Sequence, residues 1–153
     1  MKKDENKVLA NNKRAKHDYF IEKTWEAGIS LKGTEVKSVR QGHVSIQQSY
    51  VDIHAGEAWL KGLHISPYEQ GNRYNLDPVR DRRLLLHKKE IRQLAEAVQR
   101  EGYTVIPLSV VLRGRRIKVD IALARGKKLY DKRESLREAE DKRRIERTLK
   151  EWK

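Results

Sequence analysis

The sequence predicts a mainly β fold with added helices: a small antiparallel β-barrel followed by a flexible basic C-terminal tail. Three observations carry this prediction. The central part of the chain alternates apolar and polar residues with a period of two, which is typical of strands. Two helical segments interrupt the strands without the regular β–α alternation of a doubly wound parallel sheet. Both ends of the chain are dense in charge and poor in large apolar side chains.

Charge and apolar content divide the 153 residues into three parts. Residues 1–18 are expected to form a basic N-terminal arm, because they carry six Lys or Arg against three acids. Residues 19–125 hold nearly all the β-branched and aromatic side chains and are expected to form the barrel. Residues 126–153 mix charges of both signs and are expected to form a tail that is disordered when free.

The first hairpin is predicted around Ala55-Gly56, because residues 50–54 and 57–61 alternate on either side of this turn. Its register places Val51 opposite Leu60 and Ile53 opposite Ala58. A strand from Tyr19 towards Trp25 is expected to precede it.

The second hairpin is predicted around Arg113-Gly114, between residues 105–112 and 117–123. A two-residue turn at this point sets the register of both strands. The expected pairs are Val110 with Ile117, Leu108 with Val119 and Ile106 with Ile121. All of them lie on one apolar face, and Lys118 faces the other way.

Helices are predicted at two places. A short one is capped by Thr34, runs through Val36 and Val39 and is closed by Gly42, and a longer one covers residues 88–101 and stops at Gly102. Residues 80–84 are expected to add a preceding helical turn. Five or six strands with an inserted helix fit a Greek-key barrel of the oligonucleotide-binding type, an OB-fold-like architecture.

The composition also excludes several classes of function. There is no cysteine, no phosphate-binding glycine loop and no histidine pair with the spacing of a metal site, so no cofactor and no metal are expected. No apolar run is long enough to cross a bilayer and no secretory signal is seen, so we expect a cytoplasmic protein without a membrane partner. A catalytic role is disfavoured.

The formal net charge of +13 indicates an anionic partner, of which nucleic acid is the commonest. Four basic clusters are interleaved with aromatic or apolar side chains, as expected for a surface that binds phosphates and unstacked bases. They lie at residues 12–19, 80–83, 113–116 and 125–133.

Several ordered blocks of the sequence resemble the SsrA-binding protein (small protein B) family of bacterial ribosome rescue, over about residues 11–135. The blocks are residues 12–22, 25–40, 49–51 with 56–58, 82–86, 100–105 and 126–133. The resemblance implies an oligonucleotide-binding-type barrel and a transfer-messenger RNA (tmRNA, also called SsrA RNA) partner, whose tRNA-like domain lacks an anticodon stem. It further implies a stalled 70S ribosome, with the tail at the decoding centre and mRNA channel of the small subunit. Elongation factor Tu and alanyl-tRNA synthetase are implied as indirect partners through tmRNA, and no enzymatic activity is implied.

The resemblance assigns RNA contacts to Asn12, Glu26 and Leu85, and phosphate contacts to Lys118 and Arg125. An asparagine can donate and accept, a glutamate can accept from base or ribose donors, and a leucine can pack on an unstacked base. With the basic clusters, the expected RNA-binding set is Asn12, Lys13, Arg14, Lys16, Glu26, Arg83, Leu85, Lys118 and Arg125. Without the resemblance, Leu85 could equally be a core residue and Glu26 a solvated acid.

The start of the tail, residues 126–133, matches the family motif, whereas the rest of the tail resembles the family least. Its expected ribosome-sensing residues are Gly126, Lys127, Lys128, Tyr130, Asp131, Lys132, Arg133, Arg143, Ile145 and Arg147. No continuous apolar stripe runs along the tail, so we expect a helix that is marginal in water and orders against ribosomal RNA. Two alternatives remain: a general ribosome-associated RNA-binding protein and a metal-free RNA hydrolase.

Overall fold

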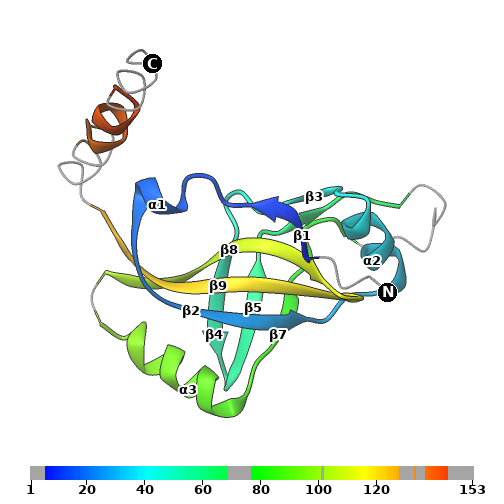
Figure 1. Cartoon of the computed structure of the whole chain (residues 1–153). Coiled ribbons are helices and arrows are strands. Elements are labelled where there is room, and N and C mark those ends of the chain that lie inside the picture. The colour runs from blue at the N-terminus through cyan, green and yellow to red at the C-terminus, as the bar shows by residue number, and fades with distance from the viewer. Residues whose placement is uncertain (1–5, 69–76, 101, 128–132, 134–136, 145–153) are drawn as a thin grey trace.

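A computed structural model describes residues 6–68, 77–100, 102–127, 133 and 137–144 (Figure 1). The strands and helices follow each other in the order β1 (Asn6–Asn11), α1 (Ala15–Asp18), β2 (Tyr19–Ile29), α2 (Gly33–Arg40), β3 (Val44–Ser45), β4 (Tyr50–His54), β5 (Glu57–Lys61), β6 (His64–Ile65), β7 (Arg82–Leu85), α3 (Lys88–Ala97), β8 (Tyr103–Arg113) and β9 (Arg116–Gly126). Residues 137–144 are also helical.

Seven strands form one antiparallel sheet, and six of them, all except β1, close into a ring. Their order is β1-β8-β4-β5-β7-β2-β9, and β9 pairs again with β8. Buried side chains from the strands, with Val39 of α2 and Leu94 of α3, fill the interior of this ring. Figure 1 shows α2 and α3 at different places around the strands. The predicted fold class, a mainly β barrel with added helices, is confirmed.

The folded part begins earlier than the sequence predicted. Residues 6–18 were expected to belong to a solvated arm, but β1 pairs with β8 and the α1 residue Ala15 is buried. The reason is that β4 pairs with β8 only at Val105. The same edge of β8 is free at residues 109–113, and β1 pairs there, so that the backbone N–H and C=O groups of both strands are hydrogen-bonded. The segment was predicted to be solvated because of its high charge, but backbone hydrogen bonds to β8 stabilise β1 as a strand.

The β4–β5 hairpin is confirmed residue by residue. Val51 lies opposite Leu60 and Ile53 opposite Ala58. Both turn residues have positive φ angles, 51° for Ala55 and 76° for Gly56. Such a turn matches the twist of the flanking strands and leaves the register no freedom.

The predicted register of the β8–β9 hairpin is wrong. Arg113 pairs with Arg116, so the turn consists of Gly114 and Arg115, and Val110 lies opposite Val119. A bulge between Pro107 and Ser109 then shifts the register again. The expected β9 core face is correct, with Ile117, Val119, Ile121 and Leu123 all in the main core. On β8 the bulge turns Ile106 and Leu108 towards a second cluster with Ala15 and Ala124.

The two helices are confirmed with changed ends, and one predicted helical turn is wrong. The N-cap of α2 is Lys32 rather than Thr34, so α2 begins at Gly33, and α3 ends at Ala97. Residues 80–84 do not form a helical turn, because Arg82–Leu85 is strand β7. Buried Arg82 and Leu84 alternate there with exposed Arg83 and Leu85, which is the period of a strand.

Candidate nucleic-acid interface

Three of the predicted contact residues share the outer face of the barrel. Gly28 of β2 lies opposite Leu85 on one side and opposite Lys118 on the other. The neighbours of Gly28 on the strand, Ala27 and Ile29, belong to the main core, so this row points outward. Leu85 is 51% exposed, which excludes the alternative that it is a core residue. An exposed leucine and a lysine thus stand on either side of a bare glycine.

Glu26 lies two residues before Gly28, on the same outer face. It is exposed and directly opposite Asp120 in the register. Two carboxylates facing each other across neighbouring strands would repel. Arg113 joins them, because its Nη1 lies 2.6 Å from Glu26 Oε2 and 2.9 Å from Asp120 Oδ1. Glu26 is therefore a paired acid and not a freely solvated one.

Asn12 is connected to this face through the β8 bulge. Its backbone N–H donates to the carbonyl of Leu108 at 2.8 Å, and its Nδ2 donates to the carbonyl of Pro107 at 3.0 Å. Part of the side-chain donor capacity of Asn12 is thus used inside the protein, while none of the described residues donates to its Oδ1, which can accept from a ligand. The same residue lines a groove of about 480 Å³ with Lys13, Arg14, Gln47 and Gln48.

A second basic group lies where β2 begins and β9 ends. The guanidinium carbon of Arg125 is 4.7 Å from the ring centroid of Phe20, and Lys127 Nζ is 4.9 Å from the same centroid. Lys127 also donates from Nζ to the carbonyl of Lys16 at 2.8 Å. Lys13, Arg14 and Lys16 are exposed, and Arg14 forms an ion pair of 3.7 Å with Asp18.

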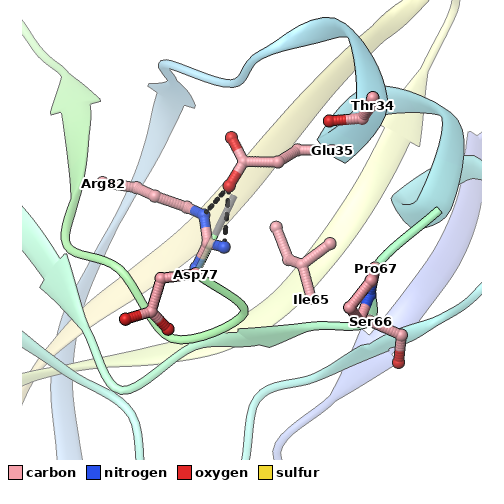
Figure 2. A pocket seen from close by; sticks show the side chains of 7 residues that line it. All are labelled: Thr34, Glu35, Ile65, Ser66, Pro67, Asp77 and Arg82. Carbon is pink, nitrogen blue, oxygen red and sulfur yellow. Dashed lines mark hydrogen bonds and ion pairs between the residues drawn. The ribbon is translucent and has the colours of Figure 1, made fainter. Parts of the chain in front are cut away.

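The three arginines of the 80–83 cluster do not form one exposed basic surface. Arg83 is exposed on the outer face, two residues from Leu85 and 3.6 Å from Glu57. Arg82 is fully buried, and its Nε and Nη2 lie 2.8 Å and 2.7 Å from Glu35 Oε2 (Figure 2). Arg80 pairs with the same carboxylate, through its Nε at 2.9 Å. Interpreting this run as a basic RNA-binding cluster was therefore wrong for Arg82.

Glu35 is an anion inside the fold. Burial acts to raise its pKa, but hydrogen bonds from Arg80, from the backbone N–H of Lys32 and from Arg82 together hold the pKa below its ordinary value. Arg82 also donates to the carbonyls of Leu63 and Pro78. This group ties α2 to β7 and to the segment before it.

Most of the predicted tail contacts lie outside the described residues. These are Lys128, Tyr130, Asp131, Lys132, Ile145 and Arg147. Gly126 is the last residue of β9, and Arg133 and Arg143 are exposed helical residues. Lys127 is fixed to α1 by a second hydrogen bond, from its backbone N–H to the carbonyl of Asp18 at 2.9 Å.

Comparison with known proteins decides the family. A model of the SmpB protein family matches residues 9–151. The chain belongs to the SmpB family. The matched range begins inside β1 and continues past the helical residues 137–144, so it includes both the barrel and the tail.

Curated relatives of the SmpB family match nearly the whole chain. The SsrA-binding protein of Caldicellulosiruptor saccharolyticus is 55% identical over 151 residues, covering 99% of this chain and 96% of its own. That of a Roseiflexus species is 56% identical over 149 residues, covering 97% and 94%. A solved structure described as "tmRNA-SmpB: a journey to the center of the bacterial ribosome" is 48% identical, with a TM-score of 0.67, and covers 83% of this chain and 93% of that one.

Sequence reasoning missed two members of the SmpB outer face, Arg113 and Asp120. Arg113 was assigned to a phosphate-binding run, whereas here it serves two carboxylates. Asp120 is not among the predicted contact residues. The alternation that placed Asp120 and Lys118 on one face was the available signal, but the partner Glu26 is 87 positions away from Arg113.

The described residues give no sign of a metal centre or of a membrane span. Among them, no three His, Asp or Glu side chains are grouped so that they could hold a metal ion. No helix in the described part of the chain is long and apolar enough to cross a membrane.

Proposed function

We propose that this chain binds tmRNA with the outer face of its barrel and acts as an RNA-binding adaptor of trans-translation. The observation that carries this proposal is the convergence of Glu26, Leu85 and Lys118 on one outer face, with Asn12 bonded to the neighbouring β8 bulge, in a chain of the SmpB family. These residues come from the β1–α1 connection and from the neighbouring strands β7, β2 and β9. SsrA RNA is the ligand in the names of the relatives, and tmRNA is named with the solved structure.

Each residue of this face offers a different contact to a folded RNA. Lys118 supplies a cation for a phosphate, and Leu85 supplies an exposed apolar surface for an unstacked base. Glu26 and the Oδ1 atom of Asn12 accept hydrogen bonds from base amino groups or ribose hydroxyls. Arg83 extends the face along β7. The combination favours a folded RNA with exposed bases over a regular duplex, whose grooves hide them.

The tRNA-like domain of tmRNA is the expected target, with the barrel in place of the absent anticodon stem. In this arrangement the group around Phe20, Arg125 and Lys127, with the exposed Lys13, Arg14 and Lys16, meets RNA phosphates at the end of the sheet. The tail, which starts after Lys127, probes the empty mRNA channel of a stalled 70S ribosome near the decoding centre. It orders there as a helix against ribosomal RNA.

The adaptor role needs no catalysis by this chain. Elongation factor Tu and alanyl-tRNA synthetase meet the complex through tmRNA, and the protein works in the cytoplasm. The chemistry of the outer face supports this assignment, because its groups are suited to hold an RNA and its two acids, Glu26 and Asp120, are both bonded to Arg113.

The test is purification of the full chain from a bacterial lysate with sequencing of the bound RNA. We expect tmRNA to dominate, and unrelated tRNA in excess at physiological salt should not displace it. Equal competition by any folded RNA would favour a general ribosome-associated RNA-binding protein instead. Cleavage of labelled RNA during long incubation would favour the hydrolase alternative.

A further inference from the structure

A cavity of about 350 Å³ opens on the outer face beside Glu26. Its lining includes Thr24 and Glu26 from β2, Leu108 and Arg113 from β8, and Asp120 from β9. Leu108 belongs to the β8 bulge, and its carbonyl accepts a hydrogen bond from the backbone N–H of Asn12. The cavity therefore adjoins the β8 bulge to which Asn12 is bonded.

Arg113 organises the polar side of this cavity. Its Nη1 and Nη2 bind the two oxygens of Asp120 at 2.9 and 3.0 Å, and Ser109 Oγ donates to Asp120 Oδ2 at 3.2 Å. The guanidinium is thereby fixed by its own hairpin and presents Nη1 to Glu26 Oε2 at 2.6 Å. The hydrogen bonds that Arg113 donates to Asp120, together with the charges of Asp120 and Glu26, raise the pKa of Arg113, so the guanidinium stays charged.

One oxygen of Glu26 is left for a ligand. Arg113 takes Oε2, and within the described part of the chain no group donates to Oε1. Two carboxylates and one guanidinium leave this spot with a net negative charge, which repels phosphate and favours a neutral hydrogen-bond donor. Leu108 adds an apolar wall. An unstacked nucleobase with an exocyclic amino group fits both properties, since it has an apolar face and a donor at its edge.

We propose that this cavity receives an amino-bearing nucleobase of the bound RNA, and that Arg113 is the positioning residue that presents Glu26 Oε1 to the amino group. The inference rests on the proposed function and adds a pocket, a chemical class of base and a residue that no family assignment supplied. Arg113 acts through Glu26 and does not itself touch the base. Without it, Glu26 and Asp120 would repel each other and the acceptor would lose its fixed direction.

The experiment is interference mapping with the full chain and the tRNA-like domain of tmRNA. Each transcript of the pool carries a few nucleotides replaced by the riboside that lacks the exocyclic amino group: inosine, purine riboside or pyrimidin-2-one riboside. Bound and free RNA are separated and the substituted positions are compared. The proteins are the unaltered chain, Glu26→Gln, Arg113→Lys and Asp120→Asn, with Arg116→Lys as the matched control.

We expect one position at which loss of the amino group weakens binding to the unaltered chain by roughly tenfold, the order for a hydrogen bond to a charged group. That interference should vanish in Glu26→Gln, Arg113→Lys and Asp120→Asn and persist in Arg116→Lys. Arg113→Lys keeps the charge and loses the fork, and melting temperatures identify a variant that has lost its fold. Full affinity of Arg113→Lys, or an unchanged interference pattern in it, would overturn the inference. Lack of RNA binding by the unaltered chain would instead refute the proposed function.

Discussion

The side chain of Leu85 covers Gly28. A β-carbon at position 28 would lie 3.2 Å from Leu85 Cβ and 3.4 Å from its Cδ1, and the two residues are register partners of β7 and β2. Because Gly28 has no side chain, the exposed Leu85 packs directly on its backbone. This contact with Gly28, and not burial in the core, positions Leu85 on the outer face.

Gly28→Ala should weaken RNA binding several-fold while leaving the fold nearly intact. The φ angle of Gly28 is not in the left-handed region, so alanine is compatible with the backbone, and the added methyl pushes an exposed side chain aside. Binding curves and melting temperatures of Gly28→Ala, Leu85→Ala and the double variant provide the check. If alanine acts through Leu85, the double variant binds no worse than Leu85→Ala. Fully additive losses would show that position 28 acts on its own.

Lys118→Ala and Glu26→Ala should separate charge from hydrogen bonding. Loss of Lys118 removes a phosphate contact, so the affinity falls and the slope of log affinity against log salt decreases by about one unit or less. Loss of Glu26 should lower the affinity with little change in that slope. Filter binding over a range of salt concentrations measures both. An unchanged affinity for Glu26→Ala would remove this residue from the site.

Glu35→Gln should destabilise the fold by about 3 kcal/mol at pH 7, because it leaves the buried Arg82 cation without its counter-charge. The matched control is Glu57→Gln, whose ion pair with Arg83 is exposed and should change stability by less than about 0.5 kcal/mol. Urea unfolding of the two variants provides the measurement. Equal, small effects would mean that the Arg82 pair adds nothing.

The same group predicts how stability depends on pH. The folded pKa of Glu35 lies below its ordinary value of 4.5, so the unfolded chain takes up this proton first as the pH falls. Its contribution is therefore complete above the ordinary value and is lost as the pH falls through the folded value. Between pH 7 and pH 3 the unaltered chain should lose more stability than Glu35→Gln does. Parallel losses would contradict the lowered pKa.

A chain that ends at Tyr130 should bind tmRNA as the full chain does and fail to support tagging of stalled translation products. The strands of the barrel and both residues that fix Lys127 precede this point. RNA affinity and a reconstituted tagging reaction measure the two activities separately. Loss of RNA affinity on truncation would refute this division of labour between barrel and tail.

How well the sequence predicted the fold depended on the turns. The hairpin at Ala55-Gly56 was predictable because both residues adopt positive φ angles, which fixes the pairing of its strands. The hairpin at Gly114 was not, because a turn displaced by one residue moves the register by two. Neither the alternation nor the turn residues contain a signal for the bulge near Leu108.

The candidate site shows the same limit. The resemblance supplied Asn12, Glu26, Leu85 and Lys118, and the barrel places the last three on one face. The partners of Arg82 and Arg113 could not be predicted, because the sequence of a basic run does not show whether its arginines bind a phosphate of a ligand or a carboxylate of the protein. Only the fold tells the two apart, because it buries Arg82 against Glu35 and sets Arg113 between Glu26 and Asp120.

The single extra residue in β8 has a consequence for how this chain can change. It allows one strand to serve two hydrophobic clusters, with Val110 in one and Ile106 in the other, and it turns the carbonyl of Leu108 towards Asn12. Deleting one residue there would reverse inside and outside along half of the strand. A change of length at the bulge would therefore disturb the interior and the proposed RNA-binding face in one event.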